Sequence, residues 1–178
     1  MAKIYEDIRQ TRPFSRPERE IAVTLIRTAD VFQHTLERAL APYASSPEQY
    51  NVLRILRGAG ERGLPTLEIA ARMLSRSPNI TRMLDKLVAK QLARRLRSRN
   101  DRRVVLITLT PQGIELLQKL DSAVEQALDN FPQLSKPEMQ NLVTLLDRIR
   151  EEFAVKTVKE RSREKFASAQ AVSTSEIS

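Results

Sequence analysis

The chain has 178 residues, 41% of them hydrophobic and only 4% aromatic, which is typical of one helix-rich globular domain built on aliphatic side chains. The absence of cysteine excludes disulfides, thiol redox chemistry and thiolate metal sites, and a single histidine argues against any metal centre. The net charge is +8, no apolar run approaches the roughly 18 residues of a membrane span, and no signal-peptide core is visible, so we expect a cytoplasmic protein without a membrane partner.

The positive charge is concentrated in one segment. Residues 72–103 hold eleven lysines and arginines against two aspartates, a net charge of +9, whereas the rest of the chain carries −1. Six of those arginines lie within residues 94–103, directly before the β-branched stretch "VVLITLT". Such a local excess indicates a surface that binds a polyanion rather than a generally solubilising composition.

Three helices are expected in the first part of the chain. The first begins at "SRPE", where Ser15 fits an N-cap and Glu18 the N3 position, and it continues to Pro42. The stretch "SPEQ" predicts a second helix capped by Ser46 that ends at the glycines of "RGAGERG". Thr66 can cap a third, short helix over "LEIAARML". The expected apolar side of this short helix comprises Leu67, Ala70, Ala71 and Leu74.

A second short helix follows at once. Ser77 and Pro78 read as its N-cap and N1, and two short amphipathic helices joined by a few residues are typical of a helix-turn-helix. Residues 94–97 and 104–109 predict two strands around the polar loop "SRND". Thr110 and the stretch "SKPE" then cap two further helices, and beyond Glu160 we expect a disordered tail. The buried stripe of the second short helix comprises Ile80, Met83, Leu84, Leu87 and Val88.

The arginine-rich hairpin and the helix before it indicate how the charge is used. Neighbouring arginines repel one another on a free surface but become favourable when they neutralise phosphates and release counterions. A hairpin beside a helix-turn-helix is the winged-helix arrangement, in which one helix enters the major groove of DNA and the hairpin reaches the minor groove. The polar face of the helix could simply be solvated, but the nearby hairpin favours DNA. This face comprises Asn79, Thr81, Arg82, Asp85, Lys86 and Lys90.

Asp101 is the acidic residue in the loop of this hairpin. A carboxylate aimed at phosphate would weaken binding, so we expect Asp101 to pair with a neighbouring arginine, for example Arg97 or Arg103, and to fix the shape of the hairpin. On this hypothesis Asp101→Ala lowers the affinity for DNA although it makes the protein more basic.

The stretches "ITRMLDKL" and "LARRLRSRNDRRVVLITLTPQG" together resemble the MarR family of bacterial and archaeal transcription regulators. The order of the helices also matches, which extends the resemblance over about residues 16–153. The resemblance implies a homodimer that presents two winged helices to a pseudo-palindromic operator, with the first and the last two helices of each subunit interleaved. Apolar faces at both chain ends independently favour dimerisation, because alone they would stay exposed to water.

The resemblance also implies site residues at the matching positions. The minor-groove arginine of the wing would be Arg102, with Arg99 as the second choice, and Asp101 and Arg103 match the structural wing pair of the family. The predicted DNA-binding residues are Pro78, Asn79, Thr81, Arg82, Lys86, Arg97, Arg99 and Arg102.

The expected fold is mainly α with a small β-wing, a winged helix-turn-helix domain joined to a helical dimerisation platform. We expect an N-terminal arm over residues 1–15, the dimerisation region over 16–45 and 110–155, the DNA-binding domain over 46–109 and the disordered tail over 160–178.

The resemblance bears on regulation as well. Many members of the family release DNA when a small molecule binds, and others sense oxidation through cysteine. Because this chain has no cysteine, regulation by a small-molecule effector is the mechanism that remains possible. His34 and Tyr50 can line a pocket for it, or they can be packing residues at a helix junction. We expect no cofactor and no metal, and by the habit of the family we expect a repressor that occludes a promoter.

Three other interpretations compete. The stretch "GAGERG" satisfies the G-x-G-x-x-G pattern, but dinucleotide binding needs a strand before it and a helix directly after it, so we interpret it as a helix stop. A winged helix can also bind RNA or a protein partner, since attraction to phosphate carries no sequence information. An enzyme has no support, because the serine, histidine and acidic residues form no nucleophile or acid–base spacing.

Overall fold

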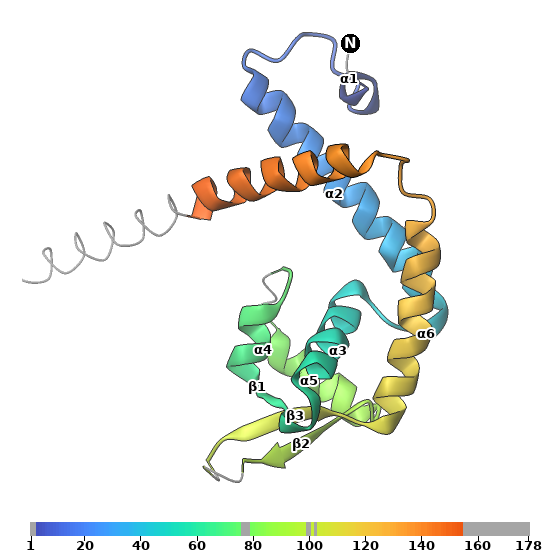
Figure 1. Ribbon diagram of the computed structural model, residues 1–178, viewed down its shortest axis with the longest axis vertical. Helices are drawn as coiled ribbons and strands as arrows, with labels where there is room; N and C mark the ends of the chain where they lie inside the picture. The colour runs from blue at the N-terminus through green and yellow to red at the C-terminus, as the bar shows by residue number, and fades with distance from the viewer. Residues whose placement is uncertain (1–2, 76–78, 99–100, 102, 155–178) are drawn as a thin grey trace, which may run out of the picture. The chain divides into compact units, whose positions relative to one another are not determined.

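The computed structural model describes residues 3–75, 79–98, 101, 103–154 of the chain. They belong to two compact units, Met1–Phe131 and Pro132–Ser178. The described residues are mostly helical with one small antiparallel sheet, as the sequence predicts (Figure 1). No helix among them is long and apolar enough to cross a membrane.

The first unit opens with a folded arm and a long helix. The arm contains α1 (Ile4–Asp7), whose Tyr5 is buried and donates a hydrogen bond of 3.1 Å from its hydroxyl to Glu20 in α2 (Pro17–Leu40). The cap expected at Ser15 is wrong: Arg16 is the N-cap and makes no side-chain cap bond. The arginine side chain has donors but no acceptor, so it cannot accept a hydrogen bond from the first N–H groups of α2.

The second long helix, α3 (Pro47–Ala59), begins with the predicted capping box. Gln49 N donates to Ser46 Oγ at 3.3 Å, while Ser46 N donates to Gln49 Oε1 at 3.4 Å. The helix ends at the glycine stretch, where a short 3₁₀ turn, η2 (Gly60–Arg62), follows. Gly60 begins this turn and Gly63 ends it, and both have positive φ. A helix therefore precedes these glycines, as we expected.

The helix-turn-helix follows as α4 (Thr66–Arg72) and α5 (Ile80–Ala89), and two details correct the sequence analysis. Thr66 is the first residue of α4 and not its cap, which is Pro65. Ile69 is buried, whereas Leu67 and Leu74 are 85% and 90% exposed, so the predicted apolar side faces outward. A helix of seven residues carries two competing apolar stripes, and its own periodicity does not decide between them.

The sheet has the order β1-β3-β2 and is antiparallel throughout. The hairpin of β2 (Ala93–Arg97) and β3 (Val105–Leu109) matches the predicted strands, with Ala93 opposite Leu109 and Arg97 opposite Val105. We call β2, β3 and the loop between them the wing. The two-residue strand β1 (Leu64–Pro65) was not predicted, because two residues carry no strand pattern.

A single apolar core holds these elements together. Helix α6 (Pro111–Leu128) is capped by Thr110, whose Oγ1 accepts a hydrogen bond of 3.0 Å from Gly113 N, and it packs against α2 and α3. Leu117 and Leu120 of α6 are fully buried. The other side chains of this core that are fully buried are Leu40, Val52, Leu53, Leu56, Ile69, Leu84, Leu87 and Ile107.

The second unit contains a helix over residues 136–154. Its predicted cap is present, because Glu138 N donates to Ser135 Oγ at 3.4 Å and Ser135 N donates to a Glu138 carboxylate oxygen at 2.8 Å. The Ser135 hydroxyl also donates to the Glu138 carboxylate at 2.6 Å, and this bond, followed by the one from Ser135 N, holds the pKa of Glu138 below its ordinary value. The predicted tail over 160–178 lies outside the described residues. Exposed apolar side chains on this helix are Met139, Leu142, Val143, Leu145 and Phe153.

Candidate nucleic-acid interface

Helix α5 buries one face and exposes the other. Leu84 and Leu87 lie in the core, with Ile80, Met83 and Val88 packed against it. The helix starts at Ile80 with Asn79 as its N-cap, two residues later than predicted, and Ser77 and Pro78 lie outside the described residues. The residues expected on the outward face are all exposed, namely Asn79, Thr81, Arg82, Asp85, Lys86 and Lys90.

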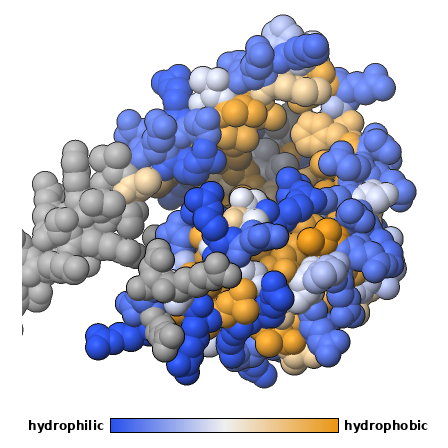
Figure 2. All heavy atoms as spheres, turned by 60° about the horizontal axis from the view of Figure 1, so that its bottom comes forward, coloured by the Kyte–Doolittle hydropathy of each residue, from blue (hydrophilic) through white to orange (hydrophobic). Residues whose placement is uncertain are grey.

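The wing lies beside α5 and carries its arginines on β2. Arg94, Arg95 and Arg97 are exposed, and Arg94 donates a hydrogen bond of 3.2 Å from Nε to Thr108 Oγ1 on β3. Arg99 and Arg102 lie outside the part of the chain that the structure describes. Figure 2 brings the sheet end of Figure 1 forward and shows hydrophilic side chains over much of this face, with hydrophobic atoms between them. Helix α5 and the wing therefore expose basic side chains on adjoining elements.

An ion pair joins these two elements. Arg95 on β2 donates from Nη2 to Asp85 Oδ1 on α5, and both side chains are about half exposed, at 46% and 52%. A pair this exposed adds little to the stability of the fold. Its geometric effect is to tie the outward face of α5 to the first strand of the wing.

Asp101 shapes the wing through the backbone. Its Oδ1 accepts a hydrogen bond of 2.9 Å from Arg103 N, and its carbonyl oxygen accepts one of 2.9 Å from Val104 N. The expected ion pair with the side chain of Arg97 or Arg103 is not formed in the described residues. The backbone N–H two residues further along the chain lies within reach of the carboxylate, so Asp101 has a hydrogen-bond partner in the main chain.

A shallow polar hollow of about 300 Å³ adjoins the outward face of α5. Residues of the α3 N-terminus line it together with Asn79, Arg82 and Lys86. Ser46 and Gln49 were expected only to cap α3, and their position beside the predicted recognition residues was not predicted. Contact between segments about 30 residues apart leaves no local pattern in the sequence.

A second, larger cavity of about 580 Å³ lies within the first unit. Tyr50 lines it, but His34 does not. The sequence analysis did not single out Asn51 and Arg54, which also line it. The other lining residues are Phe32, Gln33, Leu36, Pro47, Glu48, Leu74, Ser75, Val124 and Leu128.

Tyr50 joins this cavity to a polar cluster. Its hydroxyl donates a hydrogen bond of 2.8 Å to Asp121 Oδ1 and accepts one of 3.1 Å from Arg54 Nη1. Burial raises the pKa of Tyr50, and so does its hydrogen bond to Asp121. Burial opposes ionisation of Asp121 and by itself would raise its pKa. The hydrogen bonds that Asp121 accepts from Tyr50 and Arg57, together with the positive charges of Arg57 and Arg54, outweigh burial. The pKa of Asp121 therefore lies below its ordinary value.

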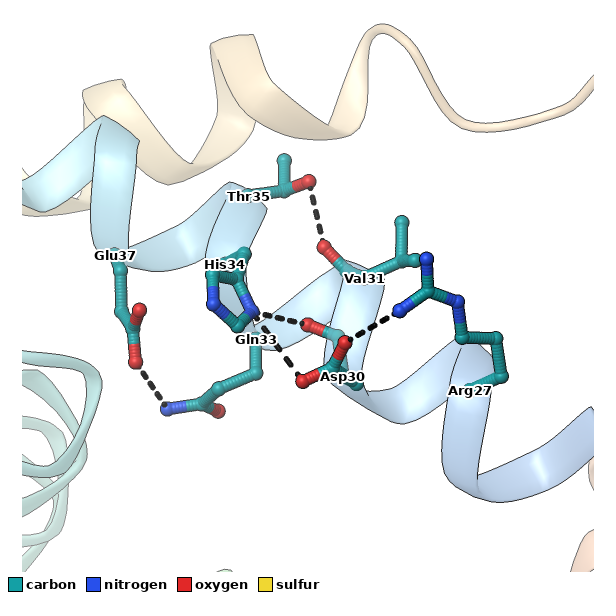
Figure 3. Close-up of polar contacts among 7 residues, drawn as sticks. All are labelled: Arg27, Asp30, Val31, Gln33, His34, Thr35 and Glu37. Carbon is teal, nitrogen blue, oxygen red and sulfur yellow. Dashed lines mark hydrogen bonds and ion pairs between the residues drawn. The ribbon is translucent and has the colours of Figure 1, made fainter. Parts of the chain in front are cut away.

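His34 lies instead on an exposed face of α2. Its Nδ1 donates a hydrogen bond of 2.9 Å to the Asp30 carbonyl, and Asp30 also pairs with Arg27 at 3.1 Å (Figure 3). The carbonyl hydrogen bond and the nearby carboxylates of Asp30 and Glu37 raise the pKa of His34. No group of three metal-ligating side chains occurs in the described residues.

Comparisons with known proteins agree with this geometry. The model of the MarR family matches residues 46–105, which span α3 to the start of β3. The HTH-type transcriptional regulator PecS of Dickeya dadantii (strain 3937) is 29% identical over 153 residues, covering 84% of this chain and 92% of PecS. A MarR transcription factor from Planctomyces limnophilus is 34% identical with a TM-score of 0.58, over 76% of this chain and 98% of that one.

A complex with DNA is among the similar structures. The S. aureus MepR–DNA complex is 26% identical with a TM-score of 0.64, covering 72% of this chain and 96% of that one. The exposed basic face of α5, the adjoining wing and the similar proteins all indicate a winged helix that binds DNA. The chain belongs to the MarR family and is a DNA-binding transcription regulator with a winged-helix fold.

Proposed function

We propose that the protein is a repressor that binds a pseudo-palindromic operator as a homodimer and excludes polymerase from a promoter. The observation that carries this proposal is the pairing of the exposed polar face of α5 with the arginines of β2 through Asp85 and Arg95. A helix that reads base edges and a wing that follows the phosphates need a defined separation. The complex of the similar MepR with DNA supports DNA as the partner, and the similar repressor CouR bound to a 23-mer DNA duplex supports the duplex form.

The residues proposed to contact DNA are those implied by the family resemblance. Asn79 and Arg82 have side chains that can form paired hydrogen bonds to adenine and guanine, and Lys86 provides a charge for phosphate. Arg97 is exposed on β2 and suits a phosphate contact. Pro78, Thr81, Arg99 and Arg102 complete the proposed set.

Exposed apolar side chains support the homodimer. Ile21, Ile26 and Val31 of α2 are 50%, 72% and 53% exposed, and the helix over 136–154 exposes an apolar row as well. Large apolar residues gathered on two helices are a typical protein interface. We therefore propose that residues 16–45 and 110–155 form the dimer platform and that residues 46–109 bind DNA.

The test is selection of bound duplexes from a random DNA pool by the purified full chain, at two salt concentrations. An enriched inverted repeat with half-sites about ten base pairs apart would support a sequence-reading dimer. Retention without a consensus that collapses steeply with salt would overturn it. Better competition by single-stranded RNA than by duplex DNA at equal salt would show that the partner is RNA.

A variant and its matched control sharpen this test. Arg82→Ala should weaken binding to the selected duplex by about 5- to 150-fold and relax the consensus at one position per half-site. Arg12→Ala removes the same charge from an exposed position in the N-terminal arm and should leave the consensus unchanged.

We further propose that a small molecule in the 580 Å³ cavity regulates the protein. The volume suits a drug-sized molecule, and the wall combines apolar side chains with Tyr50 and Arg54. A compound that raises the melting temperature of the protein and lowers its affinity for the selected duplex would support this regulation. A Tyr50→Phe or Arg54→Ala variant that responds identically would place the binding site elsewhere.

A further inference from the structure

One side-chain hydrogen bond reaches from the wall of the large cavity to the segment that leads into α5. Asn51, in the second turn of α3, accepts a hydrogen bond of 2.9 Å at Oδ1 from the backbone N–H of Leu74. Leu74 lies just beyond the end of α4 at Arg72, in the connection that precedes the N-cap of α5, Asn79. The two residues are 23 positions apart in the sequence, so this is a tertiary contact.

Little else anchors Leu74 in its position. Its side chain is 90% exposed, so burial of the leucine does not hold the segment. The preceding Met73 packs partly against the core and its N–H donates to Ala70 O at a long 3.4 Å. The bond to Asn51 therefore fixes a backbone position that weak helix-end contacts leave loosely held.

Asn51 and Leu74 both line the cavity, together with Ser75. A molecule that contacts Asn51 in the cavity would therefore act directly on the hydrogen bond between Asn51 and Leu74. The Asn51 side chain makes no other hydrogen bond among the described residues, so both N–H groups of its amide have no protein acceptor there.

We infer that Asn51 is a positioning residue for the recognition helix α5: by holding Leu74 N, it sets where the chain enters this helix. A molecule in the cavity that breaks the bond between Asn51 and Leu74 then lowers the affinity for specific DNA. This inference rests on the proposed function, because it concerns sequence-specific binding. Base contacts require the helix to keep its place in the groove, whereas phosphate attraction tolerates a shift.

The test compares three variants of the full chain. Asn51→Leu has the same branching and number of heavy atoms but lacks the acceptor, and Asn51→Asp keeps an Oδ1 acceptor. Gln10→Leu is the matched control, because Gln10 is also half-buried but lies in the N-terminal arm, does not line the cavity, and donates from its side chain to the Arg12 carbonyl at 3.0 Å.

Two quantities are measured on each variant. We expect Asn51→Leu to weaken binding to the selected duplex by about tenfold, the cost of about one base contact, and to leave binding to a scrambled duplex within about twofold. Amide exchange at Leu74 should accelerate in the same variant. Asn51→Asp should keep both quantities near the wild-type values, and Gln10→Leu should not alter them.

The inference is overturned if Asn51→Leu binds the selected duplex as tightly as the wild type, or if it loses affinity for both duplexes equally while its melting temperature falls. Failure of the proposed function gives a different result, because the wild-type protein then selects no consensus sequence from the random DNA pool. In that case amide exchange still decides: unchanged exchange at Leu74 in Asn51→Leu refutes the positioning role, and faster exchange that Asn51→Asp reverses supports it.

Discussion

Tyr50 and Asp121, 71 residues apart, are joined by a hydrogen bond of 2.8 Å from the tyrosine hydroxyl to the carboxylate. This bond connects α3, the first helix of the DNA-binding region, to α6. Arg57 of α3 also donates to Asp121, from Nη1 to Oδ2. One carboxylate on α6 therefore holds two side chains of α3 and sets the rotation of one helix against the other.

The first prediction concerns this carboxylate. Asp121→Ala should lower the free energy of unfolding by about 1–3 kcal/mol, because it removes two hydrogen bonds of a partly buried charged group. Urea unfolding followed by circular dichroism measures the loss. Glu115→Ala, also on α6, breaks only an exposed ion pair with Lys119 and should cost less than about 0.5 kcal/mol. Equal losses in the two variants would contradict the role of Asp121.

The second prediction concerns acid. The pKa of Asp121 is lower in the folded protein than its ordinary value, so the unfolded chain takes up a proton first as the pH falls. The stability that Asp121 contributes is therefore complete above about pH 4 and is lost as the pH drops through the folded-state pKa. Between pH 6 and pH 3 the free energy of unfolding should fall more steeply for the wild type than for Asp121→Asn. Parallel curves would refute the depressed pKa.

The third prediction concerns the pair of Asp85 and Arg95. Asp85→Asn makes the protein more positive, which by charge alone would strengthen DNA binding. If the pair sets the wing against α5, affinity for the selected duplex should instead fall, by about 3- to 10-fold. Asp7→Asn, an equal change of charge at an exposed position in the N-terminal arm, is the control. Fluorescence anisotropy at fixed salt compares them, and tighter binding by Asp85→Asn would show that the carboxylate only repels DNA.

The fourth prediction concerns the loop of the wing. Asp101→Ala removes the acceptor of the Arg103 N–H and should lower DNA affinity, although it removes a negative charge next to the phosphates. Asp101→Asn keeps a side-chain oxygen at the same place and should retain most of the affinity. The same anisotropy titration serves for both variants. Stronger binding by Asp101→Ala would rule out the structural role.

The fifth prediction contrasts two glycines in helices. A Cβ at Gly113 in α6 would collide with the backbone carbonyl of Leu92, so Gly113→Ala must push α6 away from the start of the wing and should cost about 2 kcal/mol or more. A Cβ at Gly58 in α3 meets nothing, so Gly58→Ala should stabilise the protein by about 0.5–1 kcal/mol. Thermal unfolding of both variants measures this difference in sign. Equal effects would contradict the close approach.

The sequence by itself determined the features that depend on local chemistry. The caps at Ser46, Thr110 and Ser135 were predicted because a cap is a hydrogen bond between residues three apart. The strands of the wing followed from β-branched residues beside a polar loop, and the buried stripe of α5 followed from its helical spacing. The concentration of positive charge in residues 72–103 needs no structure at all.

Only the tertiary structure decided which chain segments meet. The short helix α4 has two apolar stripes, and packing against the core buries Ile69 and leaves Leu67 exposed. The bonds of Asn51 to Leu74, Asp85 to Arg95 and Tyr50 to Asp121 join residues 10 to 71 positions apart. No local pattern encodes such contacts, because they depend on the path of the whole chain, and packing of the common core brings the partners together.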